Sequence, residues 1–151
     1  MRPPISDFLK PEYIALDLRA GTEPEAILEV AGTLRPDSAI LNFHGFCDEV
    51  FSREKLSPTA LGSGVAFPHA RTEHVSRIVA AVGRSRKGVW FEKCRENVHL
   101  IFVIGTPRES VREYLALLAT LAFLLKQKPV REKLMAAATR EEFFAALCQG
   151  A

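Results

Sequence analysis

The sequence predicts an α/β (α+β) fold, a three-layer sandwich in which a mixed β-sheet of about four to five strands has helices on both faces. The segment 98–105, VHLIFVIG, is so continuously apolar that we expect a central strand covered on both sides. Helical patterns precede and follow the strand-rich middle of the chain. Because 151 residues can bury a sizeable core without disulfides, we expect a single domain over residues 1–151.

The first part of the chain predicts one strand, two helices and a loop. Residues 13–18, YIALDL, alternate in hydropathy and end at a turn, which indicates a strand. Thr22 precedes a glutamate by three positions, the spacing of a capping box, and predicts a helix that runs to about Leu34. A second pattern with helical period ends near Leu56. Residues 57–64, SPTALGSG, hold too many helix and strand breakers for regular structure, so we expect a loop there.

The middle of the chain predicts three strands and a hairpin arm. Residues 64–67, GVAF, form a short strand that stops at Pro68, because proline lacks an N–H and restricts the residue before it. The second strand covers residues 77–85, and the central strand at 98–105 is the third. Between them, GVWFEKC at 88–94 is expected to add an edge strand or a hairpin arm.

Three helices are expected in the last third of the chain. The first covers residues 110–125 and contains an apolar run at 114–125, which is much shorter than the roughly 20 residues that span a bilayer. That run therefore predicts a buried core helix and no direct insertion into a membrane. Pro129 marks the start of the next helix. Thr139 and Glu142 repeat the capping-box spacing before the last one.

Composition narrows the class of partner and the compartment. The chain has 20 Lys and Arg residues against 18 Asp and Glu, a formal charge of +2, which is far from the basic balance of a dedicated nucleic-acid binder. Nucleic acid is therefore not expected as a partner. Cys47, Cys94 and Cys148 are odd in number and lack C-x-x-C spacing, which favours reduced thiols and a cytoplasmic setting over a disulfide frame or a zinc site.

The segment 61–70, LGSGVAFPHA, draws attention to His69. Proline ends the preceding strand, so we expect His69 to begin a loop at a strand end. Gly62 and Gly64 can supply a tight turn and let the backbone approach a ligand. A neutral imidazole can act as a nucleophile through one ring nitrogen while the other donates a hydrogen bond, so it can accept and return a phosphoryl group. Charge on that group calls for cations, and the nearest candidates along the chain are Arg53, Arg71 and Arg77.

Spacing alone leaves two other interpretations of His69 open. A lone histidine before a turn is as often structural as functional. A metal site with His74 is the weaker alternative, because the two histidines stand in a loop and no third ligand completes the set. The chain has neither a phosphate-binding G-x-x-x-x-G-K-[ST] loop nor a G-x-S-x-G nucleophile elbow.

The stretch GSGVAFPHAR, preceded by SREKLSPTALG, resembles the signature of the enzyme IIA domains of the phosphotransferase system, of the fructose and mannitol type. Residues 5–18, 98–107 and 114–147 follow in the order of that family, so the resemblance covers nearly the whole chain. Within the family, the PHAR ending and the chain length are most similar to the nitrogen-regulatory branch, which serves in signalling rather than in sugar transport.

The resemblance implies a phosphoryl carrier in which His69 is the phosphoacceptor. It implies transfer from a small phosphocarrier protein of the HPr or NPr type, and onward transfer to a sugar-permease IIB domain or use as a regulatory mark. Arg53 matches the arginine that lies near the phosphohistidine, and no metal ion or organic cofactor is implied. The loop that shapes the pocket is matched by Thr59, Gly62 and Gly64. The alternative function is a regulatory binding module on the same scaffold that docks to a transporter or regulator without catalysis.

One residue departs from the family pattern. Many members carry a second histidine where this chain has Tyr114. A tyrosine hydroxyl can donate a hydrogen bond to a phosphoryl oxygen, but it carries no positive charge near neutral pH. Tyr114 is therefore expected either to shape the pocket or to be a packed residue with a wet tip, and the sequence leaves both open.

Overall fold

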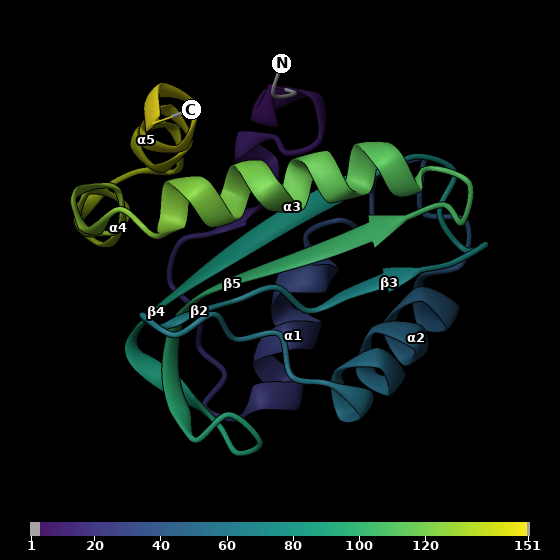
Figure 1. Ribbon diagram of the computed structural model, residues 1–151, viewed down its shortest axis with the longest axis horizontal. Helices are drawn as coiled ribbons and strands as arrows, with labels where there is room; N and C mark the ends of the chain where they lie inside the picture. Colours follow the sequence, from purple (N-terminus) through teal and green to yellow (C-terminus); the bar gives the residue numbers. More distant parts are fainter. Residues whose placement is uncertain (1–3, 151) are drawn as a thin grey trace.

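The computed structural model describes residues 4–150 of the chain. Within these residues, short helices, short strands and two longer helices precede two long strands, and three further helices follow (Figure 1). In chain order they are the 3-10 helices η1 (Ile5–Asp7) and η2 (Pro11–Tyr13), β1 (Ile14–Ala15), α1 (Glu23–Gly32), α2 (Phe43–Leu56), β2 (Val65–Ala66), β3 (His69–Arg71), β4 (Val79–Phe91), β5 (Glu96–Thr106), α3 (Val111–Leu125), α4 (Lys128–Ala136) and α5 (Arg140–Gly150).

The strands form a five-stranded mixed sheet with the order β1-β4-β5-β2, and β3 also pairs with β5. β4 and β5 are antiparallel, whereas β1, β2 and β3 run parallel to their partners. β2 and β3 pair with successive positions of β5, with Val65 opposite Leu100 and His69 opposite Ile104. They are thus two pieces of one edge, separated by Phe67 and Pro68.

Helices cover both faces of this sheet, as the sequence predicts (Figure 1). Alternate residues of β5 point to opposite sides: Leu100, Phe102 and Ile104 join the core beneath α3, α4 and α5. Ile101 and Val103 join the core on the side of α1 and α2. The continuous apolar pattern of this strand therefore reflects burial on both faces, and the predicted three-layer sandwich is confirmed.

The strand boundaries differ from the predicted ones in two places. The expected strand at 77–85 and the hairpin arm at 88–94 are one long strand, β4, with a register shift between Arg84 and Val89. Gly88 in that irregular stretch has φ +87°, which a residue without a Cβ adopts freely. The expected first strand at 13–18 is shorter, because only Ile14 and Ala15 pair with β4.

Only one of the two predicted capping boxes forms hydrogen bonds to the backbone. The Thr22 side chain makes no cap hydrogen bond, although α1 begins directly after it. At α5, the Thr139 hydroxyl accepts from the Glu142 N–H at 3.1 Å, and the Glu142 carboxylate accepts from the Ala138 N–H at 2.8 Å. Side-chain capping thus stabilises the start of the last helix and not that of the first.

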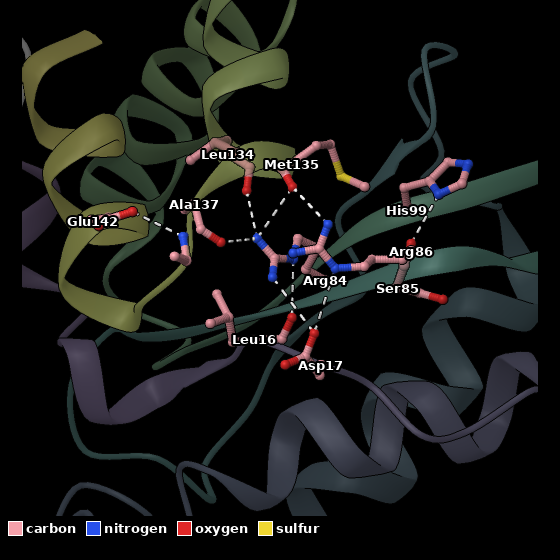
Figure 2. Close-up of polar contacts among 11 residues, drawn as sticks. Leu16, Asp17, Arg84, Ser85, Arg86, His99, Leu134, Met135, Ala137 and Glu142 are labelled. Carbon is pink, nitrogen blue, oxygen red and sulfur yellow. Dashed lines mark hydrogen bonds and ion pairs between the residues drawn. The ribbon is translucent and has the colours of Figure 1, made fainter.

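A buried arginine connects β4 to the C-terminal helices (Figure 2). The Arg84 side chain is only 1% exposed, and its guanidinium donates to backbone carbonyls at the end of α4, namely those of Leu134 at 3.0 Å, Met135 at 3.4 Å and Ala137 at 2.7 Å. Its Nε donates to the Leu16 carbonyl at 3.0 Å. The last carbonyls of a helix lack partners within the helix, so this arginine satisfies them and places a positive charge at the negative end of the helix dipole.

The apolar run at 114–125 lies in α3 and packs on the sheet, as expected, with Leu117, Leu121 and Leu124 almost fully buried. Among residues 4–150, no helix has both the length and the apolar character that crossing a membrane requires. All three cysteines are free, which agrees with the predicted reduced thiols.

Candidate functional site

His69 lies in a surface hollow of about 370 Å³ between α2, β3 and the segment after β5. Three arginines line this hollow together with the histidine: Arg53 from α2, Arg71 from β3 and Arg108 from the segment after β5. The only carboxylate among the lining residues is that of Glu49. The hollow therefore presents a net positive charge around a half-buried imidazole, which suits an anionic ligand.

The prediction that His69 begins a loop is wrong, because His69 is the first residue of β3. Pro68 cannot donate a hydrogen bond, but its carbonyl accepts from the Ile104 N–H at 3.0 Å. This bond keeps the chain alongside β5, and strand pairing resumes at His69 opposite Ile104. His69 consequently lies in an edge strand that is paired with the central strand β5, and not in a flexible loop.

The hydrogen bond at Nδ1 decides which nitrogen of His69 is available. Nδ1 lies 2.9 Å from the carbonyl oxygen of Phe67. A carbonyl can only accept, so Nδ1 carries the proton in this contact and Nε2 of the neutral ring keeps its lone pair. Burial lowers the pKa of His69 below its ordinary value, Arg53 lowers it further, and the bond to Phe67 opposes both. The neutral, nucleophilic form is thus favoured near neutral pH.

The arginines of the hollow are held by hydrogen bonds to neighbouring groups. The Arg53 guanidinium donates to the Ser57 carbonyl at the end of α2 at 3.0 Å. Arg71 donates to the Arg108 carbonyl at 3.3 Å, and Arg108 in turn lies 3.4 Å from a Glu49 carboxylate oxygen. Sequence reasoning missed Arg108. Its position just after the predicted central strand was a signal, but this position becomes informative only once the order of the strands in the sheet is known.

Arg77, the third arginine that the sequence offered, does not line the hollow. Its guanidinium forms an ion pair with the buried Asp37 at 2.6 Å, and Asp37 also accepts from the Tyr13 hydroxyl. Arg77 is therefore part of a structural polar cluster at another place in the fold.

Tyr114 of α3 lies against the imidazole of His69. The two ring centroids are 5.2 Å apart with an interplanar angle of 41°. Tyr114 is only 4% exposed, and its hydroxyl has no hydrogen-bond partner within residues 4–150. Burial raises the pKa of Tyr114 to about 12, while the positive charges of Arg53 and Arg71 act in the opposite direction. Packing alone does not account for a buried hydroxyl without a partner.

Comparison with known proteins identifies the family. Residues 7–150 match the family described as the phosphoenolpyruvate-dependent sugar phosphotransferase system, EIIA 2. The chain belongs to this family. The predicted resemblance is confirmed, and it extends over nearly the whole chain.

Both regulatory and sugar-specific proteins are similar to this EIIA chain. The crystal structure of the nitrogen regulatory protein IIA-Ntr from Neisseria meningitidis is 34% identical, has a TM-score of 0.87, and aligns over 95% of this chain and 98% of its own. A nitrogen regulatory protein of Bradyrhizobium diazoefficiens is 28% identical over 145 residues, which are 95% of this chain and 94% of the relative. The fructose-specific EIIABC component of Bacillus subtilis is 28% identical over 138 residues, and the EIIA chain spans only 22% of its length.

The loop residues expected to shape the pocket of this EIIA chain lie in different places. Thr59 anchors the loop near the site: its hydroxyl donates to Glu54 at 2.8 Å, and its carbonyl accepts from the Phe67 N–H at 3.2 Å. Gly62 is exposed, with φ +80°. Gly64, with φ +77°, lines a separate hollow with residues of α4. The structure thus brings Arg53, Arg71 and Tyr114 to His69 but not the two glycines.

The alternative of a metal site receives no support from the described residues of the EIIA chain. His74 is 3.8 Å from a carboxylate oxygen of Glu49, which also accepts from the Thr72 hydroxyl. Within residues 4–150, no group of three or more His, Cys, Asp or Glu side chains is arranged to hold a metal ion.

Proposed function

We propose that the chain acts as one EIIA unit over residues 1–151, which accepts a phosphoryl group on Nε2 of His69 from the phosphohistidine of a small phosphocarrier protein of the HPr or NPr type. The observation that carries this proposal is the imidazole itself. Its Nδ1 is bonded to the Phe67 carbonyl, which leaves the Nε2 lone pair for a phosphorus atom in a hollow lined by three arginines. This enzyme would be a component of a cytoplasmic phosphotransferase system.

The transfer balances without an added acid or base. The Nε2 lone pair forms a bond to phosphorus while the phosphorus–nitrogen bond of the carrier breaks and its electron pair returns to the carrier imidazole. If the other nitrogen of the carrier ring holds a proton, that ring leaves neutral. The positive charge then rests on the His69 ring, whose Nδ1–H keeps donating to the Phe67 carbonyl. Catalysis consists of positioning and charge stabilisation, as is general for phosphoryl transfer.

The arginines would offset the negative charge that arrives with the phosphoryl group. Arg53 acts electrostatically on His69 and lines the same hollow, so it is suited to contact the phosphoryl oxygens. Arg71 and Arg108 line the outer part and are held by backbone or side-chain contacts. We assign Arg53 to the transferred group and the other two to partner docking.

The relatives support two kinds of downstream partner. One relative is named a fructose-specific EIIABC component and the other a nitrogen regulatory protein. We therefore propose onward transfer to a sugar-permease IIB domain or a phosphorylation-dependent contact with a regulatory protein.

The test is incubation with phosphoenolpyruvate and the general phosphotransferase proteins, followed by intact mass measurement. The wild-type chain is expected to gain one phosphoryl group and His69→Ala none. His99→Ala is the matched control, because His99 also lies on a strand and has Nδ1 bonded to a carbonyl, that of Ser85 at 2.8 Å, but outside the arginine hollow. It should be phosphorylated like wild type. An unlabelled wild-type chain, or a labelled His69→Ala chain, would contradict the proposal, and the former would favour a binding module without catalysis.

A further inference from the structure

The Tyr114 hydroxyl is the one buried side-chain polar atom without a hydrogen-bond partner in the described part of the chain. The other tyrosine, Tyr13, is similarly buried at 8% exposure, but its hydroxyl donates to Asp37. A buried polar group without a partner destabilises the fold, because it has lost its hydrogen bonds to water. A buried polar group of this kind needs an explanation, and one explanation is a ligand that accepts its hydrogen bond.

The surroundings of this hydroxyl point to an anion at the imidazole. Tyr114 approaches His69 from α3, with the ring centroids 5.2 Å apart. Arg53 and Arg71, which both line the hollow, are close enough to act on the tyrosine electrostatically. The hydroxyl keeps its proton at neutral pH, since burial raises the pKa of Tyr114 to about 12. It is therefore a neutral donor beside two cations and one nucleophile.

We propose that the Tyr114 hydroxyl donates a hydrogen bond to an oxygen of the phosphoryl group held on His69, so that phosphorylation satisfies a donor that is unpartnered in the free chain. This inference rests on the proposed function. The tyrosine forms no covalent bond and loses no proton in the step; it supplies one O–H to an oxygen of the transferred group. The unsatisfied hydroxyl thus destabilises the free chain but not the phosphorylated chain. This difference shifts the equilibrium of the phosphoryl group from the carrier toward His69.

The direct test is the equilibrium of the phosphoryl group between the phosphocarrier and this chain. Wild type and Tyr114→Phe are each mixed with the phosphorylated carrier, and the four species are quantified by intact mass. Tyr114→Phe keeps the ring against His69 and removes only the donor, so the equilibrium should move back toward the carrier by about tenfold to a hundredfold, the range for a hydrogen bond to a charged group. An equilibrium equal to that of wild type overturns the inference.

A second measurement shows whether the free chain carries an unsatisfied hydroxyl. The thermal midpoint of the unphosphorylated Tyr114→Phe chain should equal or exceed that of wild type, because the substitution removes a buried donor that has no partner. Tyr13→Phe is the matched control: it removes a donor that has a partner, so its midpoint should fall while the phosphoryl equilibrium stays as in wild type. A lowered midpoint for Tyr114→Phe would contradict the inference.

Failure of the proposed function can be told apart from failure of this inference. If wild type accepts no phosphoryl group from the carrier, both chains are phosphorylated with phosphoramidate, and occupancy of His69 is matched by peptide mass. The rise in thermal midpoint on phosphorylation should be larger for wild type than for Tyr114→Phe. Equal rises would overturn the role of Tyr114 whatever the carrier does.

Discussion

At the scale of single residues, the chemistry of His69 depends on two local contacts. The Phe67 carbonyl holds the proton on Nδ1, and the partial burial of the ring disfavours a second proton. The first places the proton of the neutral ring on Nδ1, and the second favours that neutral ring, so Nε2 keeps its lone pair. The same two contacts make the stability of the protein depend on pH.

The lowered pKa of His69 predicts a loss of stability in mild acid. The unfolded chain has the ordinary histidine pKa of 6.5, whereas the folded pKa is lower. Well above pH 6.5 both states are neutral at this residue and it has no effect. As the pH falls below that value the unfolded chain binds the proton first, so stability falls until the folded pKa is passed. His69→Gln should remove this part of the pH dependence.

The measurement is the free energy of unfolding by denaturant, for wild type and His69→Gln, from about pH 8 to about pH 5. The unfolding free energy of wild type minus that of His69→Gln should be constant well above the histidine pKa of the unfolded chain, and it should decrease as the pH falls below that pKa. A difference that stays constant, or that shifts in favour of wild type in acid, would show that the folded state does not resist protonation of His69.

The sequence could single out the histidine at the centre of the hollow but not all of its neighbours. The Pro-His pair after a short strand, together with the family signature, indicated His69 and Arg53. Arg108 and the unpartnered hydroxyl of Tyr114 depend on how three elements meet, and spacing along the chain carries no such information. Arg77 shows the converse, since it is close to His69 in sequence but is paired with Asp37.

At the scale of elements, β3 shows where a local rule gave a wrong prediction. Proline removes one N–H, and this favours ending a strand when only one neighbour is considered. Here β2 and β3 both pair with β5, and between them the Pro68 carbonyl still accepts a hydrogen bond from β5, so the missing N–H does not end the edge. A register shift likewise lets β4 continue past Gly88, where the sequence predicted that one strand ends and a separate edge strand or hairpin arm follows. Helices were easier to predict, because their apolar periodicity and breakers lie within the elements themselves.

The buried hydrogen bonds of Arg84 predict that the contact of α4 and α5 with the sheet depends on this one side chain. Arg84→Met keeps the length and apolar stem but removes the buried guanidinium that donates to the Leu134 and Ala137 carbonyls at the end of α4 (Figure 2). We expect a loss of about 3 kcal/mol or more, the usual effect of leaving buried polar groups unpaired. Hydrogen exchange should increase first in α4 and α5, because these helices lose their connection to β4.

Arg86→Met is the control for this prediction. Arg86 also reaches the Met135 carbonyl, at 3.3 Å, but its side chain is 58% exposed, so water can replace the contact. Its effect should stay within about 0.5 kcal/mol, as for most surface substitutions. Denaturant unfolding of both variants gives the comparison. Equal losses would mean that the burial of Arg84 adds nothing to the attachment of α4.

At the scale of the whole molecule, the site needs all three layers. α2 and α3 cover opposite faces of the sheet, and β3 lies between them (Figure 1). Arg53 reaches the site from α2, Tyr114 from α3, and His69 from the edge of the sheet itself. A layered arrangement therefore surrounds one imidazole with a cation on one side and a neutral donor on the other.

The charge of the hollow, rather than that of the whole chain, should govern the encounter with a phosphorylated carrier. The formal net charge is only +2, but three arginines and one glutamate line the hollow. A negatively charged phosphohistidine is attracted to such a site, and salt screens the attraction. The second-order rate of transfer should therefore fall as ionic strength rises. Arg71→Ala should lower the rate by about two- to fivefold at low salt and flatten its salt dependence.

Rapid mixing with the phosphorylated carrier at several ionic strengths measures this dependence. Arg71 is suited to the test because its side chain is exposed and, within residues 4–150, its guanidinium hydrogen-bonds only to the Arg108 backbone carbonyl, so little else should change. Lys87→Ala removes the same charge from an exposed position that lines a different hollow, and it should leave both the rate and its salt dependence as in wild type. Equal slopes for Arg71→Ala and wild type would show that docking depends on shape and apolar contact instead of on the arginines.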